Sequence, residues 1–222
     1  MAWDEAPAGK RPGVLIVHQF MGLSDHERER AERLAALGYV GFAADVYGKG
    51  RRPATPQEAM AMTAELRADR PLLRARVRAA LDALRTDDQV DARRMAAIGF
   101  CFGGTAAIEL ARSGADLAGV VSFHGGLSSP EPGAGRNIKA KVLVLHGADD
   151  PTISAENIAA FQQEMRSGGV DWQMVYYGGA VHGFTQKAAG SDPSKGVAYN
   201  EIADRRSWQA MRGFLAEIFA AP

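Results

Sequence analysis

Short apolar runs alternate along this chain with longer segments in which apolar residues recur every three or four positions. The short runs predict buried strands, and the longer segments predict amphipathic helices. Strands are expected at residues 14–17, 39–43, 95–100, 118–123, 141–146 and 172–177. Strands that alternate with helices in this way are typical of a mainly parallel sheet covered by helices on both faces.

Helix boundaries are marked by capping residues. Residues 24–27 and 55–58 both have the spacing of a capping box, and Pro56 occupies the first helical position of the second. Gly38 is expected to end the first of these helices. A closing helix over residues 201–219 has an apolar face that we expect to pack in the core.

Six arginines lie between Arg67 and Arg85, interleaved with leucine and valine at helical spacing. This pattern predicts an amphipathic helix whose arginines point into solvent. It is not typical of a patch that binds nucleic acid, because the apolar positions between the arginines form a continuous face.

Composition narrows the class of protein. The 222 residues are 46% hydrophobic and 23% charged, so we expect one α/β domain over residues 1–222. Basic and acidic residues balance at 26 each, which predicts a small-molecule partner rather than nucleic acid or a membrane. No apolar run approaches the roughly 20 residues of a membrane span. Residues 1–5 lack a secretory pattern, and one cysteine cannot form an internal disulfide, so a cytoplasmic location is expected.

The run Gly99-Phe100-Cys101-Phe102-Gly103-Gly104 has the pattern of a nucleophile elbow, with the chain's single cysteine in place of the usual serine. An expected strand precedes it and a helix-forming segment follows it, which is the context that this sharp turn requires. The glycines allow neighbouring backbone to approach closely. The alternative is a buried cysteine that only fills space, which is the commoner role of a free cysteine.

A nucleophilic Cys101 needs a base and an acid. In proteins with a nucleophile elbow, both follow the nucleophile along the chain, the acid before the histidine. The turn after the strand at residues 141–146 contains Asp149 and Asp150, and His182 is the one histidine beyond that turn. His182 is therefore the expected base. Either aspartate could be the acid, since both could also cap the helix that begins near Ser154.

With these motifs in this order, the chain resembles the dienelactone hydrolase family of α/β-hydrolases. The resemblance extends from about Pro12 to Phe219 and is carried by residues 99–104, 146–150 and 182–184, in that order. It implies an α/β-hydrolase fold, a small ester or lactone as substrate, and Asp150 as the acid, with Asp149 left to form the turn. The family opens with a pair of antiparallel strands, which this chain is expected to lack in large part, with Trp3 as a remnant.

An acyl carbon under attack by a thiolate puts negative charge on its oxygen, which two backbone N–H groups must stabilise. One donor on this scaffold is the residue after the nucleophile, here Phe102. By resemblance the second is the Phe20 amide, in the loop at residues 18–22. The side chains of Phe20, Met21 and Phe102 either face the acyl group or pack in the core.

The chain differs from the family that it resembles at two positions of the expected site. Gln19 stands where the family has a glutamate against the thiol, and Gln186 stands where it has an arginine for the substrate carboxylate. We therefore expect a preference for neutral esters or lactones, with Gln19, Met21, Tyr47 and Gln186 contacting the substrate. The alternative is that an arginine between Arg67 and Arg78 binds a carboxylate instead.

Three other readings stay open at this stage. The fold could serve a binding protein without catalysis, or an acyltransferase or thioesterase that uses the same acyl-enzyme. His18, His124 and His146 follow expected strands, where a metal could bind. We expect no metal and no cofactor, because a cysteine nucleophile hydrolyses an ester without either.

Overall fold

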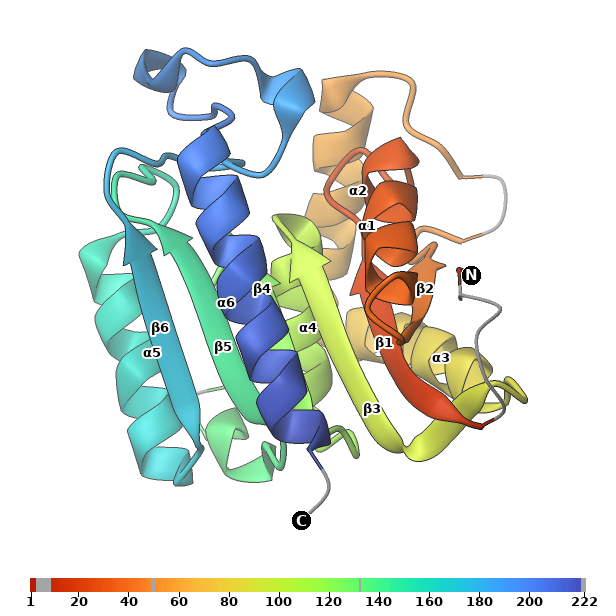
Figure 1. Cartoon of the computed structure of the whole chain (residues 1–222). Coiled ribbons are helices and arrows are strands. Elements are labelled where there is room, and N and C mark those ends of the chain that lie inside the picture. Colours follow the sequence, from red (N-terminus) through yellow and green to blue (C-terminus); the bar gives the residue numbers. More distant parts are fainter. Residues whose placement is uncertain (3–8, 49–50, 132, 221–222) are drawn as a thin grey trace.

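The computed structural model describes residues 1–2, 9–48, 51–131 and 133–220 (Figure 1). The strands are β1 (Arg11–Val17), β2 (Val40–Ala44), β3 (Val90–Phe100), β4 (Gly119–Phe123), β5 (Lys141–Gly147) and β6 (Trp172–Tyr177). The helices are α1 (Asp25–Ala35), α2 (Pro56–Ala68), α3 (Arg70–Arg85), α4 (Phe102–Arg112), α5 (Ala155–Gly168) and α6 (Glu201–Phe219). Three short 3₁₀ helices are η1 (Ala134–Asn137), η2 (Lys187–Ala189) and η3 (Pro193–Lys195).

The strands form one parallel sheet in the order β2-β1-β3-β4-β5-β6. Side chains alternate between its two faces, so that Leu15 and Val17 of β1 pack on one side and Val14 and Ile16 on the other. Helices α3, α4 and α5 cover the first face, and α1 and α6 cover the second (Figure 1). The strands are apolar on both faces because both are buried.

The fold confirms the predicted α/β-hydrolase architecture, and each expected strand is present within a few residues of its expected bounds. Beyond β2, the pairing found among the described residues is an isolated antiparallel bridge between Ala2 and Gly41. Trp3, the expected remnant of the family's edge strands, lies outside the described residues.

The capping predictions hold at the first helix and in part at the second. Ser24 and Glu27 form the reciprocal capping box that begins α1. Thr55 accepts a hydrogen bond from the Glu58 N–H, as predicted. Glu58, however, reaches back to the Ala54 N–H, 2.8 Å away, so the second box is displaced by one residue.

The prediction for the arginine-rich segment is wrong in two respects. The segment is split between two helices, because Asp69 caps the Leu72 N–H and starts a new helix just before Pro71. Several of its arginines are also not solvated. Arg70 is only 8% exposed, and Arg74 forms an ion pair with Glu109 of α4. The packing of α3 on α4 draws these guanidinium groups inward.

The loops that follow β1, β3, β5 and β6 all lie at the carboxyl edge of the sheet. Ligand sites of parallel α/β sheets form at this edge. Among the described residues, no helix is both long and apolar enough to cross a membrane.

Candidate active site

Cys101 stands at the sharp turn between β3 and α4, with a backbone φ of 53°. Few residues other than glycine adopt this conformation, and such strain is typical of functional sites. A Cβ on Gly99 would lie 2.0 Å from the Gly103 carbonyl oxygen, and one on Gly103 would lie 2.1 Å from that of Val17. The two glycines are therefore required for the turn to close against the end of β1.

The structure brings Cys101, His182 and Asp150 together. The Cys101 Sγ lies 3.1 Å from His182 Nε2, and His182 Nδ1 lies 2.9 Å from Asp150 Oδ2. His182 comes from the loop after β6, and Asp150 from the loop after β5. This is the geometry of a nucleophile, a base and an orienting acid.

The charges of the three groups support one another. Burial by itself would lower the pKa of His182, but its contacts with Asp150 and Cys101 outweigh burial and raise the pKa to about 10. Burial would likewise raise the pKa of Cys101, yet the hydrogen bond and charge of His182 lower it below its usual range. Both shifts favour the thiolate and imidazolium forms of the pair, the reactive state of a cysteine nucleophile.

The two adjacent aspartates have different partners. Asp150 is 6% exposed, and its second oxygen accepts from the Thr152 N–H and hydroxyl at 2.8 and 2.6 Å. Burial would raise the pKa of Asp150, but His182 and Thr152 together lower it. Asp149 is exposed and accepts from the Gly179 N–H, 2.8 Å away. Asp149 therefore ties the two loops together, and Asp150 is the aspartate in contact with His182.

The two predicted oxyanion donors, the backbone N–H groups of Phe20 and Phe102, lie in two segments next to Cys101. Phe102 opens α4, where the first N–H groups have no partner within the helix, and its amide bonds Cys101. In the loop after β1, the Gly22 N–H donates to the Gln19 carbonyl at 3.1 Å and closes a turn. This turn leaves the N–H groups of its central residues, Phe20 and Met21, unused.

A cleft with two arms opens at Cys101 and His182, which line both arms together with Phe20 and Val197. The first arm, of about 350 Å³, is mainly apolar. Three predicted substrate contacts line it, namely Gln19, Met21 and Gln186. The second arm, of about 400 Å³, has a polar wall that includes Thr63, Arg67, Arg70 and Thr105.

The side chains of Tyr47, which was expected at the substrate, and of Phe102, for which core packing was an open alternative, both lie in the core. Tyr47 is 1% exposed, and its hydroxyl donates to the Phe20 carbonyl. The prediction that Tyr47 contacts substrate is therefore wrong. The Phe102 side chain is fully buried and stacks on the Tyr47 ring, with 5.9 Å between centroids. Only the Phe102 backbone is in position to serve the site.

The three histidines that were considered as metal ligands each contact different groups. His18 contacts backbone groups on two loops, and His124 Nε2 lies 2.8 Å from the Thr185 hydroxyl. His146 packs edge-on against Tyr176. Within the described part of the chain, no three histidine, cysteine or acidic side chains are grouped to hold a metal ion.

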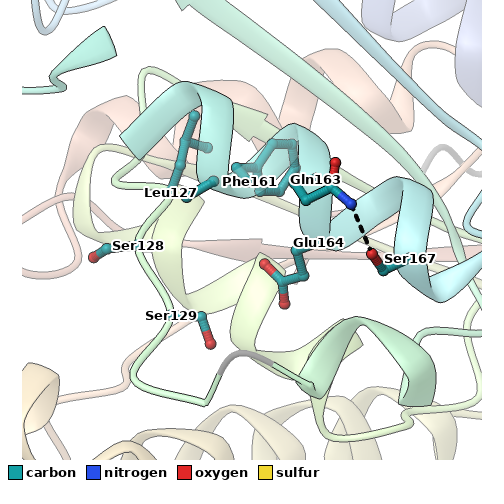
Figure 2. A pocket seen from close by; sticks show the side chains of 8 residues that line it. Leu127, Ser128, Ser129, Phe161, Gln163, Glu164 and Ser167 are labelled. Atoms are coloured by element: carbon teal, nitrogen blue, oxygen red, sulfur yellow. Dashed lines mark hydrogen bonds between the residues drawn. The ribbon is translucent and has the colours of Figure 1, made fainter. Parts of the chain in front are cut away.

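A third pocket, of about 280 Å³, lies between the loop at residues 127–129 and α5 (Figure 2). Glu164 on its wall is bound by Arg112 through two hydrogen bonds of 2.9 and 2.6 Å. Gln163 donates to Ser167 at the rim, 3.1 Å away. These side chains satisfy one another. Leu127 and Ser128 line both this pocket and the second arm of the cleft, but Cys101 and His182 do not line this pocket.

Sequence reasoning missed Thr152, although a threonine two residues after an aspartate often donates to it, so Thr152 had a local signal. Arg70 was included only in the alternative that an arginine between Arg67 and Arg78 binds a carboxylate. His18 was considered only as a metal ligand, because its contacts depend on how the loop after β1 packs on the sheet.

The parallel sheet with this cysteine, histidine and aspartate at its carboxyl edge is the architecture of an α/β-hydrolase. A sequence model of the "Dienelactone hydrolase family" matches residues 2–219, and the chain belongs to this family. It is accordingly a hydrolase.

Relatives of known structure cover nearly the whole chain. A structure named "m3DLH" is 48% identical with a TM-score of 0.94, and covers 98% of this chain and 91% of its own. The "Dienelactone Hydrolase-like" promiscuous phosphotriesterase P91, from metagenomic libraries, is 45% identical with a TM-score of 0.93 and the same coverage. A Salmonella typhimurium protein with the inferred name carboxymethylenebutenolidase is 27% identical over 97% of this chain and 81% of its own.

Proposed function

We propose that the protein hydrolyses small carboxylic esters or lactones through a thioester on Cys101, with His182 as general acid and base and Asp150 as its orienting acid. The observation that carries the proposal is the continuous line of contacts from Cys101 Sγ through His182 to Asp150, with distances of 3.1 and 2.9 Å. The contacts of His182 keep the thiol ionised, which makes the sulfur nucleophilic before substrate arrives.

In the first half of the reaction, the Cys101 thiolate attacks the carbonyl carbon, and the carbonyl oxygen becomes an oxyanion. The N–H groups of Phe20 and Phe102 stabilise this charge. The bond from carbon to the alcohol oxygen then breaks, and His182 gives its Nε2 proton to the leaving oxygen. The acyl group remains on sulfur as a thioester, and His182 is neutral.

In the second half, neutral His182 takes a proton from water, and the resulting hydroxide attacks the thioester carbon. The bond from carbon to sulfur breaks, which releases the carboxylic acid and restores the thiolate and imidazolium. Asp150 keeps Nδ1 of His182 protonated throughout, so Nε2 always faces the reacting atoms.

The first test is turnover of 4-nitrophenyl acetate and of a small lactone by the wild-type protein and the Cys101→Ala variant. We expect the wild type to hydrolyse both and the variant to be inactive while it folds normally, as followed by circular dichroism. Hydrolysis by the variant at the wild-type rate would contradict the proposal. If the folded wild-type protein hydrolysed no ester, the alternative function as a binding protein without catalysis would be favoured.

The two arms of the cleft favour substrate groups of different charge. In the apolar arm, Gln19 and Gln186 present neutral amides, which favours neutral groups there. In the other arm, Arg70 is 8% exposed and forms no hydrogen bond or ion pair with the part of the chain that the structure describes. The charge of the Glu109 carboxylate acts on this guanidinium without a hydrogen bond between them. Its Nε and Nη1 groups have no partner among the described residues, which supports an acidic substrate group bound beside it.

The remaining alternatives use the same thioester. An acyltransferase or thioesterase would give up the acyl group to a nucleophile other than water, or take it from a thiol. Product analysis in the presence of an added alcohol or amine separates these reactions from hydrolysis. The cytoplasmic location stays a prediction from the single free cysteine.

A second candidate activity is cleavage of phosphotriesters, favoured by the 45% identity to the phosphotriesterase P91. The thiolate would attack phosphorus, the bond from phosphorus to the 4-nitrophenyl oxygen would break, and the phosphoryl oxygen would occupy the site of the two N–H donors. Water activated by His182 would then cleave the bond from sulfur to phosphorus, which releases the phosphodiester and restores the thiolate. Release of 4-nitrophenol from a neutral 4-nitrophenyl phosphotriester, with more than one turnover per Cys101, would support this activity. A single release per protein molecule, with loss of esterase activity, would show inactivation instead.

A further inference from the structure

Three buried rings connect the two segments that supply the proposed oxyanion donors. His18 follows β1, Tyr47 follows β2, and Phe102 begins α4, and each is at most 1% exposed. Ring centroids lie 4.6 Å apart for His18 and Tyr47, 6.0 Å for His18 and Phe102, and 5.9 Å for Tyr47 and Phe102. We call these three residues the aromatic cluster.

Two members of the aromatic cluster bind the carbonyl groups of the loop at residues 18–22. The Tyr47 hydroxyl donates to the Phe20 carbonyl, and His18 Nδ1 lies 2.6 Å from the Gln19 carbonyl. The Gln19 N–H, in turn, points to a carboxylate oxygen of Glu27 at 3.4 Å. The Gln19 carbonyl and the Phe20 N–H belong to one peptide unit, so His18 holds that unit directly. Tyr47 holds the following unit through the Phe20 carbonyl, and Glu27 holds the preceding one through the Gln19 N–H.

The donor roles of both side chains are determined. The Val46 N–H donates to His18 Nε2 at 3.2 Å, so the proton of the neutral ring is on Nδ1 and is given to Gln19. Burial lowers the pKa of His18 to about 4, which keeps the ring neutral. Burial raises the pKa of Tyr47, which keeps its hydroxyl protonated.

The segment that carries Tyr47 is itself held from outside. Arg76 of α3 donates to the carbonyls of Val46 and Tyr47 at 3.0 and 2.8 Å. Asp45 accepts from the Tyr47 N–H at 3.2 Å, which is the turn-stabilising role expected of it. The aromatic cluster therefore rests on a rigid support rather than on a free loop.

We propose that Tyr47 and His18 are positioning residues, which hold the Phe20 peptide so that its N–H points at the developing oxyanion. The inference rests on the proposed function, because the oxyanion forms only when a carbonyl is attacked. Phe102 contributes twice, since its ring packs in the aromatic cluster and its N–H is the second donor. The cluster thus fixes both donors relative to each other.

The test compares Tyr47→Phe with wild type in two reactions of the same sulfur. Ester hydrolysis requires the oxyanion donors, whereas alkylation by iodoacetamide requires only the thiolate. We expect the kcat for 4-nitrophenyl acetate to fall about tenfold to a hundredfold, with KM and the alkylation rate unchanged. A loss of alkylation in proportion to hydrolysis would overturn the inference, because the defect would then be in the sulfur.

The matched control is Tyr177→Phe, which removes another buried tyrosine hydroxyl, one without a hydrogen-bond partner among the described residues. This control should retain the wild-type kcat. A second variant, His18→Asn, keeps a donor near the position of Nδ1 and is expected to retain more activity than His18→Ala. Equal activity of the two His18 variants would contradict the proposed role of the Nδ1 proton.

Hydrogen exchange separates failure of this inference from failure of the proposed function. Tyr47→Phe should speed amide exchange in a peptide that covers residues 18–22, whether or not any ester is hydrolysed. A wild-type protein without esterase activity would contradict the function alone if this exchange still rises. Unchanged exchange and unchanged kcat in Tyr47→Phe would overturn the inference and leave the function standing.

Discussion

Asp150 contacts His182 Nδ1 from a buried position, while its neighbour Asp149 joins two loops at the surface. This difference predicts unequal effects of the same substitution. Asp150→Asn should lower kcat by several orders of magnitude, because the amide stabilises the wrong imidazole tautomer. Asp149→Asn is the matched control and should cost much less. Steady-state kinetics of both variants measure the difference, and equal losses would mean that the acid is not Asp150.

The pKa shifts predict the pH dependence of the sulfur. The pKa of His182 is raised to about 10, so its positive charge persists up to that pH. This charge lowers the pKa of Cys101 below the usual thiol value of about 8.5. Alkylation by iodoacetamide should therefore already be fast at neutral pH. Ester hydrolysis should decline as pH rises through about 10, because His182 then loses the proton needed by the leaving group.

The His182→Gln variant is the control for this pH dependence. Without the imidazolium, burial dominates and raises the pKa of Cys101. The alkylation midpoint should move upward to about 8.5 or above. If the wild type and His182→Gln gave the same alkylation profile, His182 would not be the group that ionises the sulfur.

At the scale of elements, the turn between β3 and α4 packs directly on the end of β1. A Cβ on Gly103 would lie 2.1 Å from the Val17 carbonyl oxygen, whereas one on Gly178 would meet nothing within 4 Å. Gly103→Ala should lower the free energy of unfolding by about 1–3 kcal/mol, because the backbone must shift. It should also lower kcat, since Cys101 and Phe102 move with the turn.

Gly178→Ala is the control for this substitution and should leave both quantities close to wild type. Urea denaturation and ester kinetics on the two variants provide the comparison. A Gly103→Ala protein that is as stable and as active as Gly178→Ala would show that the close approach is not needed.

The elements also show what the sequence could predict. The short apolar runs placed all six strands of the described sheet, because parallel strands are buried on both faces. Glycine spacing and chain order pointed to Cys101 and His182, since a turn and the order of loops are local properties, while the choice of Asp150 over Asp149 came from the family resemblance. The structure brings these three side chains together. The surroundings of Tyr47 and Arg70 could not be predicted in this way, because the wall that a side chain faces depends on the packing of several elements.

At the scale of the whole molecule, the cleft joins loops from the carboxyl ends of the strands to α2 and α3, and it is apolar on one side and cationic on the other. Arg70→Met should lower kcat/KM for an ester with a carboxylate by about tenfold or more, the value of a charged hydrogen bond. It should leave a neutral ester of similar size nearly unchanged. Stability should change little, because Arg70 forms no hydrogen bond with another described residue that the variant would break.

Arg205→Met changes the net charge equally at an exposed position of α6 and serves as the control for this comparison. Its kcat/KM values for the two esters should both match wild type. If Arg70→Met lowered kcat/KM for both esters to the same degree, Arg70 would support the cleft without binding an anion. A wild-type preference for the neutral ester that Arg70→Met leaves unaltered would also contradict an acidic group in this arm.

The thioester on Cys101 is the central claim of this account. The most direct measurement is acid quenching of the protein during turnover of 4-nitrophenyl acetate, followed by intact mass determination and peptide mapping. We expect one acetyl group per molecule on Cys101, formed and lost at rates consistent with turnover, and none in Cys101→Ala. An acyl group on another residue, or undiminished turnover after stoichiometric alkylation of Cys101, would contradict the account.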